Sequence, residues 1–158
     1  SDFAGEYFQL AAARCEPKPV QEHLPIWVGG GGEKVTLRIC AQWADGWNVP
    51  FIGPADWAAK ARVLDAHCER IGRDPSDITK SVNVALVGSE EQLQTQFGRL
   101  ADSVRPTVFT GTSQQMIDHA AAFAEAGADY VILAVRAPFD RDAIERFAAE
   151  VVPAFTAG

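Results

Sequence analysis

Four consecutive glycines form the stretch of this 158-residue chain best suited to bind a ligand: Gly29, Gly30, Gly31 and Gly32. They follow an apolar run at residues 26–28 and precede a helical pattern that begins at Glu33. The first N–H groups of a helix have no internal partner, and the helix dipole adds positive potential there. Glycine also allows φ > 0 and close approach of a phosphate to the backbone. The turn therefore predicts an anion site, and a tight strand–helix turn without a ligand is the alternative.

Three further places carry polar groups that would reach the same ligand. Lys34 lies in the first turn of the expected helix, where its charge would favour an anion, unless it belongs to a solvated helix face. Asn48 ends the next expected strand, and Gly88 with Ser89 follows a third. Arg136 follows a fourth expected strand. Its planar guanidinium group suits a phosphate or carboxylate, and the alternative is an exposed loop arginine. Because the carboxyl ends of parallel strands share one edge, we expect these groups to gather there.

No set of residues predicts catalysis or metal binding. No Ser-His-Asp or Cys-His set can be assembled, so the catalytic residues stay unassigned. The three cysteines, Cys15, Cys40 and Cys68, show neither a CxxC nor a metal-ligand spacing. They are expected to be buried free thiols of a protein in the reducing cytoplasm. Asp45 is expected to satisfy backbone donors at a strand start.

The elements that position these groups alternate between strands and helices. Strands are expected near residues 26–28, 44–49, 79–87 and 130–135. Helices are expected over 33–42 and 55–71, after two capping boxes formed by Ser89 with Gln92 and by Thr112 with Gln115, and after the last strand. Alternation of this kind implies parallel strands joined by right-handed crossovers. We therefore predict an α/β fold with about four parallel strands and flanking helices over residues 25–158, preceded by a linker arm or hairpin over residues 1–24.

Composition narrows the class of partner. The net charge of −7 argues against general binding of nucleic acid, which uses a basic surface. No apolar run approaches the ~20 residues of a membrane span, and the first residues show no signal-peptide pattern. A small-molecule ligand bound at a local site is the expectation that remains. The chain is also well short of the roughly 250 residues of a full (β/α)8 barrel.

One long stretch resembles a known family. The run PIWVGGGGEKVTLRICAQWADGWN is similar to the central signature of the luciferase-like family of flavin- and deazaflavin-dependent oxidoreductases. The segments FAGEYFQL, PKPVQ and AGADYVIL resemble the same family in the same order. Members of that family fold as a (β/α)8 TIM-type barrel and hold the cofactor at the carboxyl ends of the strands. The resemblance therefore implies that this chain is the C-terminal half of such a barrel, with four βα units.

The resemblance also implies a function. The glycine amides would hold the phosphate of coenzyme F420, or alternatively of FMN, for hydride transfer or monooxygenation of a small organic substrate. The ring-binding and acid–base residues of the family lie mostly in the N-terminal half, so the isolated chain is expected to be inactive. Two alternatives stay open: a non-catalytic half-barrel that acts as a phosphate-binding or assembly module, and an unrelated phosphate-binding α/β protein with a doubly wound sheet.

An arc of four strands has consequences for assembly. We expect the strands that contain Ile26 and Tyr130 to lie at its two open edges. We also expect Trp27, Trp47 and Val84, or their neighbours, to stay half covered on its concave face. The chain is therefore predicted to form a homodimer or higher oligomer, or to pair with the missing N-terminal half-barrel. Replacement of Gly31 by valine is expected to block φ > 0 there and weaken cofactor binding.

Overall fold

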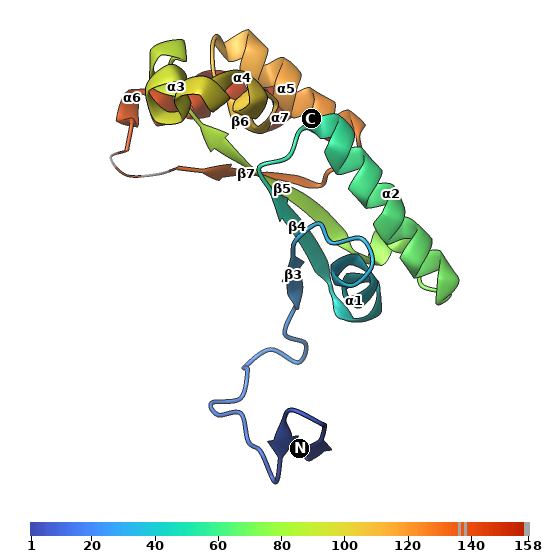
Figure 1. Cartoon of the computed structure of the whole chain (residues 1–158). Coiled ribbons are helices and arrows are strands. Elements are labelled where there is room, and N and C mark those ends of the chain that lie inside the picture. The colour runs from blue at the N-terminus through green and yellow to red at the C-terminus, as the bar shows by residue number, and fades with distance from the viewer. Residues whose placement is uncertain (136, 138, 157–158) are drawn as a thin grey trace.

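The computed structural model describes residues 1–135, 137 and 139–156, and its centre is a parallel sheet (Figure 1). Four strands form an arc in the order β3 (Trp27–Gly29), β4 (Gly46–Pro50), β5 (Thr79–Leu86) and β7 (Tyr130–Ala134). All three pairings between them are parallel. β3 and β7 lie at the two edges of the arc, as the sequence predicted.

The helices follow the strands in the expected alternation. They are α1 (Thr36–Trp43), α2 (Pro54–Arg70), α3 (Glu90–Phe97), α4 (Ala101–Val104), α5 (Ser113–Glu125), α6 (Arg141–Arg146) and α7 (Pro153–Thr156). Single 3-10 turns lie at Pro75–Asp77, Gly98–Leu100 and Arg105–Thr107, and a π-helical turn at Phe147–Val151 joins α6 to α7. Among the described residues, no helix is long and apolar enough to cross a membrane.

The core lies between the sheet and the helices α1, α2 and α5. The sequence predicts one apolar stripe on α2, formed by Trp57, Ala61, Leu64, Cys68 and Ile71. Its first four residues are buried, whereas Ile71 follows the end of the helix and is 52% exposed, so that part of the prediction is wrong. The rings of Trp57 and Trp47 lie 5.5 Å apart. Trp47 and Val84 are fully buried on this helix-covered face, so the expectation that they would be half covered on the concave face is wrong. Side chains alternate along a strand, and it is the neighbours of Trp47 and Val84 that face the concave side.

The concave face has a polar centre and an apolar margin. The Asn48 carboxamide donates to Ser81 Oγ at 2.8 Å and to Asn83 Oδ1 at 3.1 Å. Three large apolar side chains beside this centre remain exposed: Trp27 at 47%, Tyr130 at 60% and Ile132 at 43%. The strand register places all of them on the same side of the sheet. The part of the concave-face expectation that concerned Trp27 is therefore confirmed.

Three local differences from the expected elements have physical causes. α1 begins at Thr36 instead of Glu33, because a wide turn in which Leu37 N donates to Gly32 O precedes it. A two-residue strand, β6 (Val108–Phe109), pairs with the end of β5 where a loop was expected. The last helix is divided, with Pro153 at the start of α7, since proline cannot donate the next helical hydrogen bond.

The first residues form an arm. β1 (Phe3–Ala4) pairs antiparallel with β2 (Gln9–Leu10), and the following segment leads to β3. Figure 1 shows the arm extending away from the sheet and its helices. The division into an arm over residues 1–24 and a half-barrel over residues 25–158 remains a proposal.

Candidate functional site

The glycine turn lies at the carboxyl end of β3 and is tied to β4. Gly30 N donates to Asn48 O at 2.8 Å, and Gly30 O accepts from Trp47 Nε1 at 2.9 Å. Gly30 has φ = 123°, a conformation that side-chain-bearing residues rarely adopt. The turn therefore requires glycine at this position. Asn48 meets the turn through its backbone carbonyl, while its side chain belongs to the polar centre of the concave face.

The next two glycines present backbone donors without partners. Within the described residues, neither the Gly31 nor the Gly32 N–H donates a hydrogen bond. The N-terminus of α1 also lacks a capping side chain and an acidic residue in its first turn. These open donors and the helix dipole make the turn suited to an oxyanion. Gly31 does not have a positive φ, so the expected reason for its glycine is wrong, and the strained position is Gly30.

Two residues of α2 hold the turn in place. Lys60 Nζ donates to Glu33 Oε1 at 2.6 Å, and this hydrogen bond holds the pKa of the Glu33 carboxyl below its usual value. His67 Nε2 donates to Glu33 O at 2.8 Å. A Cβ added to Gly31 would lie 3.7 Å from Lys60 Cε, so the Lys60 side chain borders the open amides. Sequence reasoning missed Lys60, because a lysine 27 residues downstream carries no local signal of proximity.

Two other basic residues, Lys34 and Arg136, were predicted to bind the same ligand. Lys34 is exposed at the turn and forms no ion pair among the described residues, so its charge is available to a ligand. Arg136 lies outside the described residues. The structure thus places Gly29, Gly30, Gly31, Gly32 and Lys34 on one turn, with Asn48 beside them on the next strand.

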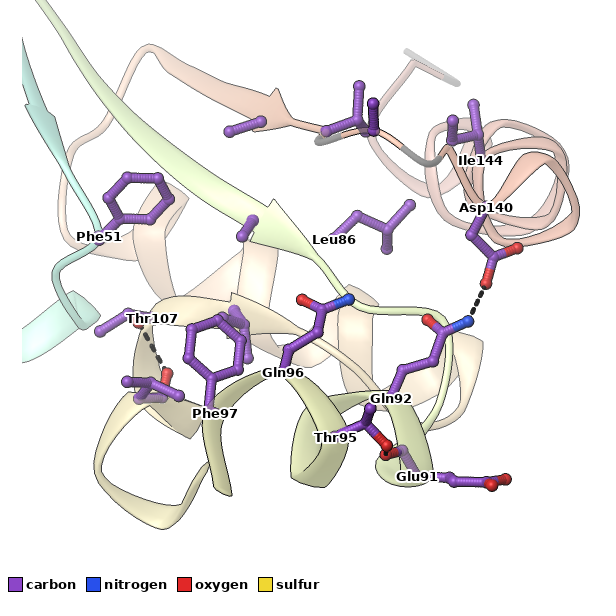
Figure 2. Close-up of a pocket in the computed structure, with 16 residues that line it drawn as sticks. Phe51, Leu86, Glu91, Gln92, Thr95, Gln96, Phe97, Thr107, Asp140 and Ile144 are labelled. Carbon is purple, nitrogen blue, oxygen red and sulfur yellow. Dashed lines mark hydrogen bonds between the residues drawn. The ribbon is translucent and has the colours of Figure 1, made fainter. Parts of the chain in front are cut away.

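A second feature at the same end of the sheet is a cavity of about 720 Å³. It lies at the carboxyl ends of β5, β6 and β7, between these strand ends and α3, and beside α6 (Figure 2). Its lining includes Phe51 after β4, Gln92, Gln96 and Phe97 of α3, and Asp140 before α6. The sequence pointed to the adjoining Gly88 and Ser89 only, since the α3 residues carry no motif.

A polar contact closes one side of this cavity. Gln92 Nε2 donates to Asp140 Oδ2 at 2.7 Å, and Gly88 N donates to Gln92 Oε1 at 3.0 Å. Asp140 also caps α6 by accepting from Ala143 N at 2.9 Å, and this hydrogen bond lowers the pKa of Asp140. Ser89 caps α3 as expected, although the Gln92 side chain bonds Gly88 and does not complete a capping box. The capping box at Thr112 and Gln115 is confirmed.

These elements define the chain as an α/β protein built as an arc of a TIM-type barrel, with a glycine turn that has open backbone donors and a cavity at the carboxyl ends of its strands. The chain belongs to the luciferase-like monooxygenase family, whose sequence model matches residues 1–97. This confirms the family resemblance seen in the sequence.

Solved structures share the fold. An F420-dependent secondary alcohol dehydrogenase in complex with an F420–acetone adduct superposes with a TM-score of 0.82 at 19% identity, covering 98% of this chain and 55% of that one. A coenzyme F420-dependent tetrahydromethanopterin reductase from Methanopyrus kandleri superposes with a TM-score of 0.76 at 16% identity, covering 98% and 58%. A riboflavin lyase with modified FMN gives 0.71 at 12% identity, covering 98% and 47%. At these identities the likeness establishes the fold alone.

A relative found by sequence is also much longer than this chain. An uncharacterized protein of Mycobacterium tuberculosis is 27% identical over 123 residues, which cover 78% of this chain and 41% of that protein. The chain therefore spans less than two thirds of the relatives it matches, in sequence and in structure.

Proposed function

We propose that this chain is the cofactor-phosphate-binding half of a luciferase-like oxidoreductase that uses coenzyme F420, or alternatively FMN, with a small organic molecule as substrate. The observation that carries the proposal is the pair of unpaired amides at Gly31 and Gly32, next to the uncapped N-terminus of α1. An oxyanion there would accept hydrogen bonds that no group of the described chain accepts. The solved relatives named for F420 and FMN support this class of cofactor.

The residues present fit a phosphate group. The two open N–H groups would donate to its oxygens, the free Lys34 ammonium would lie on one side, and Lys60 borders the turn on another. The cofactor itself supplies the hydride or oxygen chemistry, and the protein binds and orients it. Nothing in the geometry favours a non-catalytic module over this role. Cys40 and Cys68 are buried free thiols as expected, whereas Cys15 is exposed, so the expectation of burial is wrong there. Free thiols suit a cytoplasmic location, which is part of the same proposal.

Replacement of Gly31 by valine is expected to weaken cofactor binding by about 1–3 kcal/mol, the range for loss of hydrogen bonds to a charged group. The glycine has ordinary space for one Cβ, which would lie 3.5 Å from Val49 Cγ2. The two further methyls of valine would crowd Lys60 and cover the amides. Titration of the chain with F420 and with FMN, followed by cofactor fluorescence, measures the change.

Gly31→Ala is the matched control, because its single Cβ fits and should change the affinity little. Lys34→Met should also weaken binding, whereas Lys18→Met in the N-terminal arm should not. Equal affinities for the Gly31→Val variant and the parent chain would rule out the glycine turn as the phosphate site.

Self-association is the second expectation that belongs to this proposal. The edge strands β3 and β7 are open, and the exposed Trp27, Tyr130 and Ile132 lie on the concave face next to them. Open edges with apolar flanks recruit another chain, and a symmetric dimer is the simplest closed arrangement. Sedimentation at micromolar concentration should show a dimer or a larger species. Ile132→Lys, at a position 43% exposed, should shift the equilibrium toward monomer without unfolding the chain.

A parent chain that sediments as a monomer at all concentrations would contradict this expectation. It would leave the phosphate site untouched, because the glycine turn is built within one chain.

A further inference from the structure

The cavity at the carboxyl ends of β5, β6 and β7 has the size of a small-molecule site. Its volume of about 720 Å³ falls within the ~300–1,000 Å³ typical of ligand pockets. Most of its walls are apolar and come from two parts of the chain, residues 86–108 and 135–144, with contributions from Leu86, Phe97, Val104, Val108, Val135 and Ile144. In Figure 2, Leu86, Phe97 and Ile144 lie on different sides of the space at the end of β5.

Most polar side chains that line the cavity already have a hydrogen-bond partner within the protein. Thr107 Oγ1 donates to Val104 O, and Thr95 Oγ1 donates to Glu91 O. Gln92 and Asp140 bind each other. The side chains of Gln96 and Glu91, both exposed, have no hydrogen-bond partner among the described residues, and in Figure 2 the Gln96 carboxamide is the one that points into the cavity. One donor and one acceptor are therefore offered to a ligand against apolar walls.

A strained residue borders the same space. Phe51 has φ = 52°, which is unusual for a bulky side chain and costs on the order of 1–3 kcal/mol. Its N–H donates to Asn83 O at 2.9 Å, and its ring lies at the margin of the cavity in Figure 2. Strain of this kind concentrates at ligand sites, where it fixes a side chain in a position that the relaxed backbone would not give.

We propose that this cavity binds an uncharged, largely apolar small molecule whose single carbonyl or hydroxyl group hydrogen-bonds to Gln96. The two carboxylates of its described lining, Glu91 and Asp140, disfavour an anion, and the apolar walls disfavour any buried charge. Naming this ligand as the organic substrate of the oxidoreductase rests on the proposed function. The binding itself needs neither the cofactor nor the glycine turn.

Titration of the chain with 2-octanone in the absence of cofactor tests the site. Methyl NMR signals of Leu86, Val108 and Ile144 and the Gln96 side-chain amide signals should shift together. Octanoate should bind at least about tenfold more weakly, because its charge would lose hydration in an apolar cavity. Gln96→Leu should weaken ketone binding about fivefold, the effect of one neutral hydrogen bond. Gln94→Leu, on the same helix but outside the lining, should leave it unchanged.

The assignment would be overturned by octanoate binding as tightly as the ketone, by unchanged binding in Gln96→Leu, or by shifts at Trp27 and Tyr130 on the concave face in place of the cavity. Gly31→Val is expected to keep full ketone binding. A chain that binds 2-octanone at this cavity but neither F420 nor FMN would contradict the proposed function and leave the cavity assignment standing.

Discussion

Turnover by this chain alone is expected to be absent, with no oxidation of reduced F420 or reduced FMN above the uncatalysed rate. The glycine turn would fix one end of a cofactor, but the reactive ring needs walls on both sides to be oriented and shielded from water. The concave face of the arc would cover only one side of the ring, and Trp27, Tyr130 and Ile132 remain exposed on it. Purified chain with reduced cofactor and 2-octanone, followed by absorbance, gives the measurement.

The binding titration of the same sample is the control, since it separates a chain that binds without turnover from one that does not bind. Sustained oxidation that depends on the ketone and disappears in Gly31→Val would show that the arc alone forms a complete active site. In that case the requirement for a second half-barrel would have to be given up.

Trp47→Ala is expected to lower the free energy of unfolding by about 3–5 kcal/mol, the usual cost of removing a large buried aromatic side chain. The Trp47 side chain is fully buried and packs against Trp57. It also carries the hydrogen bond to Gly30 O, so it connects the core to the glycine turn. Trp47→Phe should retain most of the packing and lose that bond, at a cost of about 1–3 kcal/mol. Urea unfolding followed by circular dichroism measures both variants.

Trp43 supplies a matched control, because it is 71% exposed and its replacement by phenylalanine should change stability by less than about 0.5 kcal/mol. Trp47→Phe should also weaken cofactor binding, whereas Trp43→Phe should not. If Trp47→Phe unfolds like the parent chain and binds the cofactor equally well, the indole hydrogen bond does not position the glycine turn.

Much of the fold followed from local patterns in the sequence. The stripe of Trp57, Ala61, Leu64, Cys68 and Ile71 predicted α2 to within one residue at each end, because a buried helical face imposes its own spacing, although Ile71 itself is exposed beyond the helix. Alternation of strands and helices predicted a parallel arc, since parallel neighbours need a crossover of a dozen or more residues, which is usually a helix. The glycine run located the turn between β3 and α1, because the positive φ at Gly30 requires glycine; oxyanion binding there stays a prediction.

The errors arose where the outcome depended on a contact between distant segments. The sequence assigned Trp47 and Val84 to the concave face, although the side of a strand that packs on helices is set by register and by where the helices lie. It gave Gly31 the positive φ that belongs to Gly30, whose conformation is fixed by hydrogen bonds from Trp47 and to Asn48.

The sequence by itself determined the family, the parallel arc and the turn, because each depends on residues that are close along the chain. Only the tertiary structure brought Lys60 and His67 of α2 to Glu33, and Gln96 to the cavity at the ends of β5, β6 and β7. These placements depend on how helices pack across the sheet, and the residues involved lie far apart along the chain. Residue spacing alone does not predict such contacts, because they form only when the helices pack against the sheet in a close-packed core.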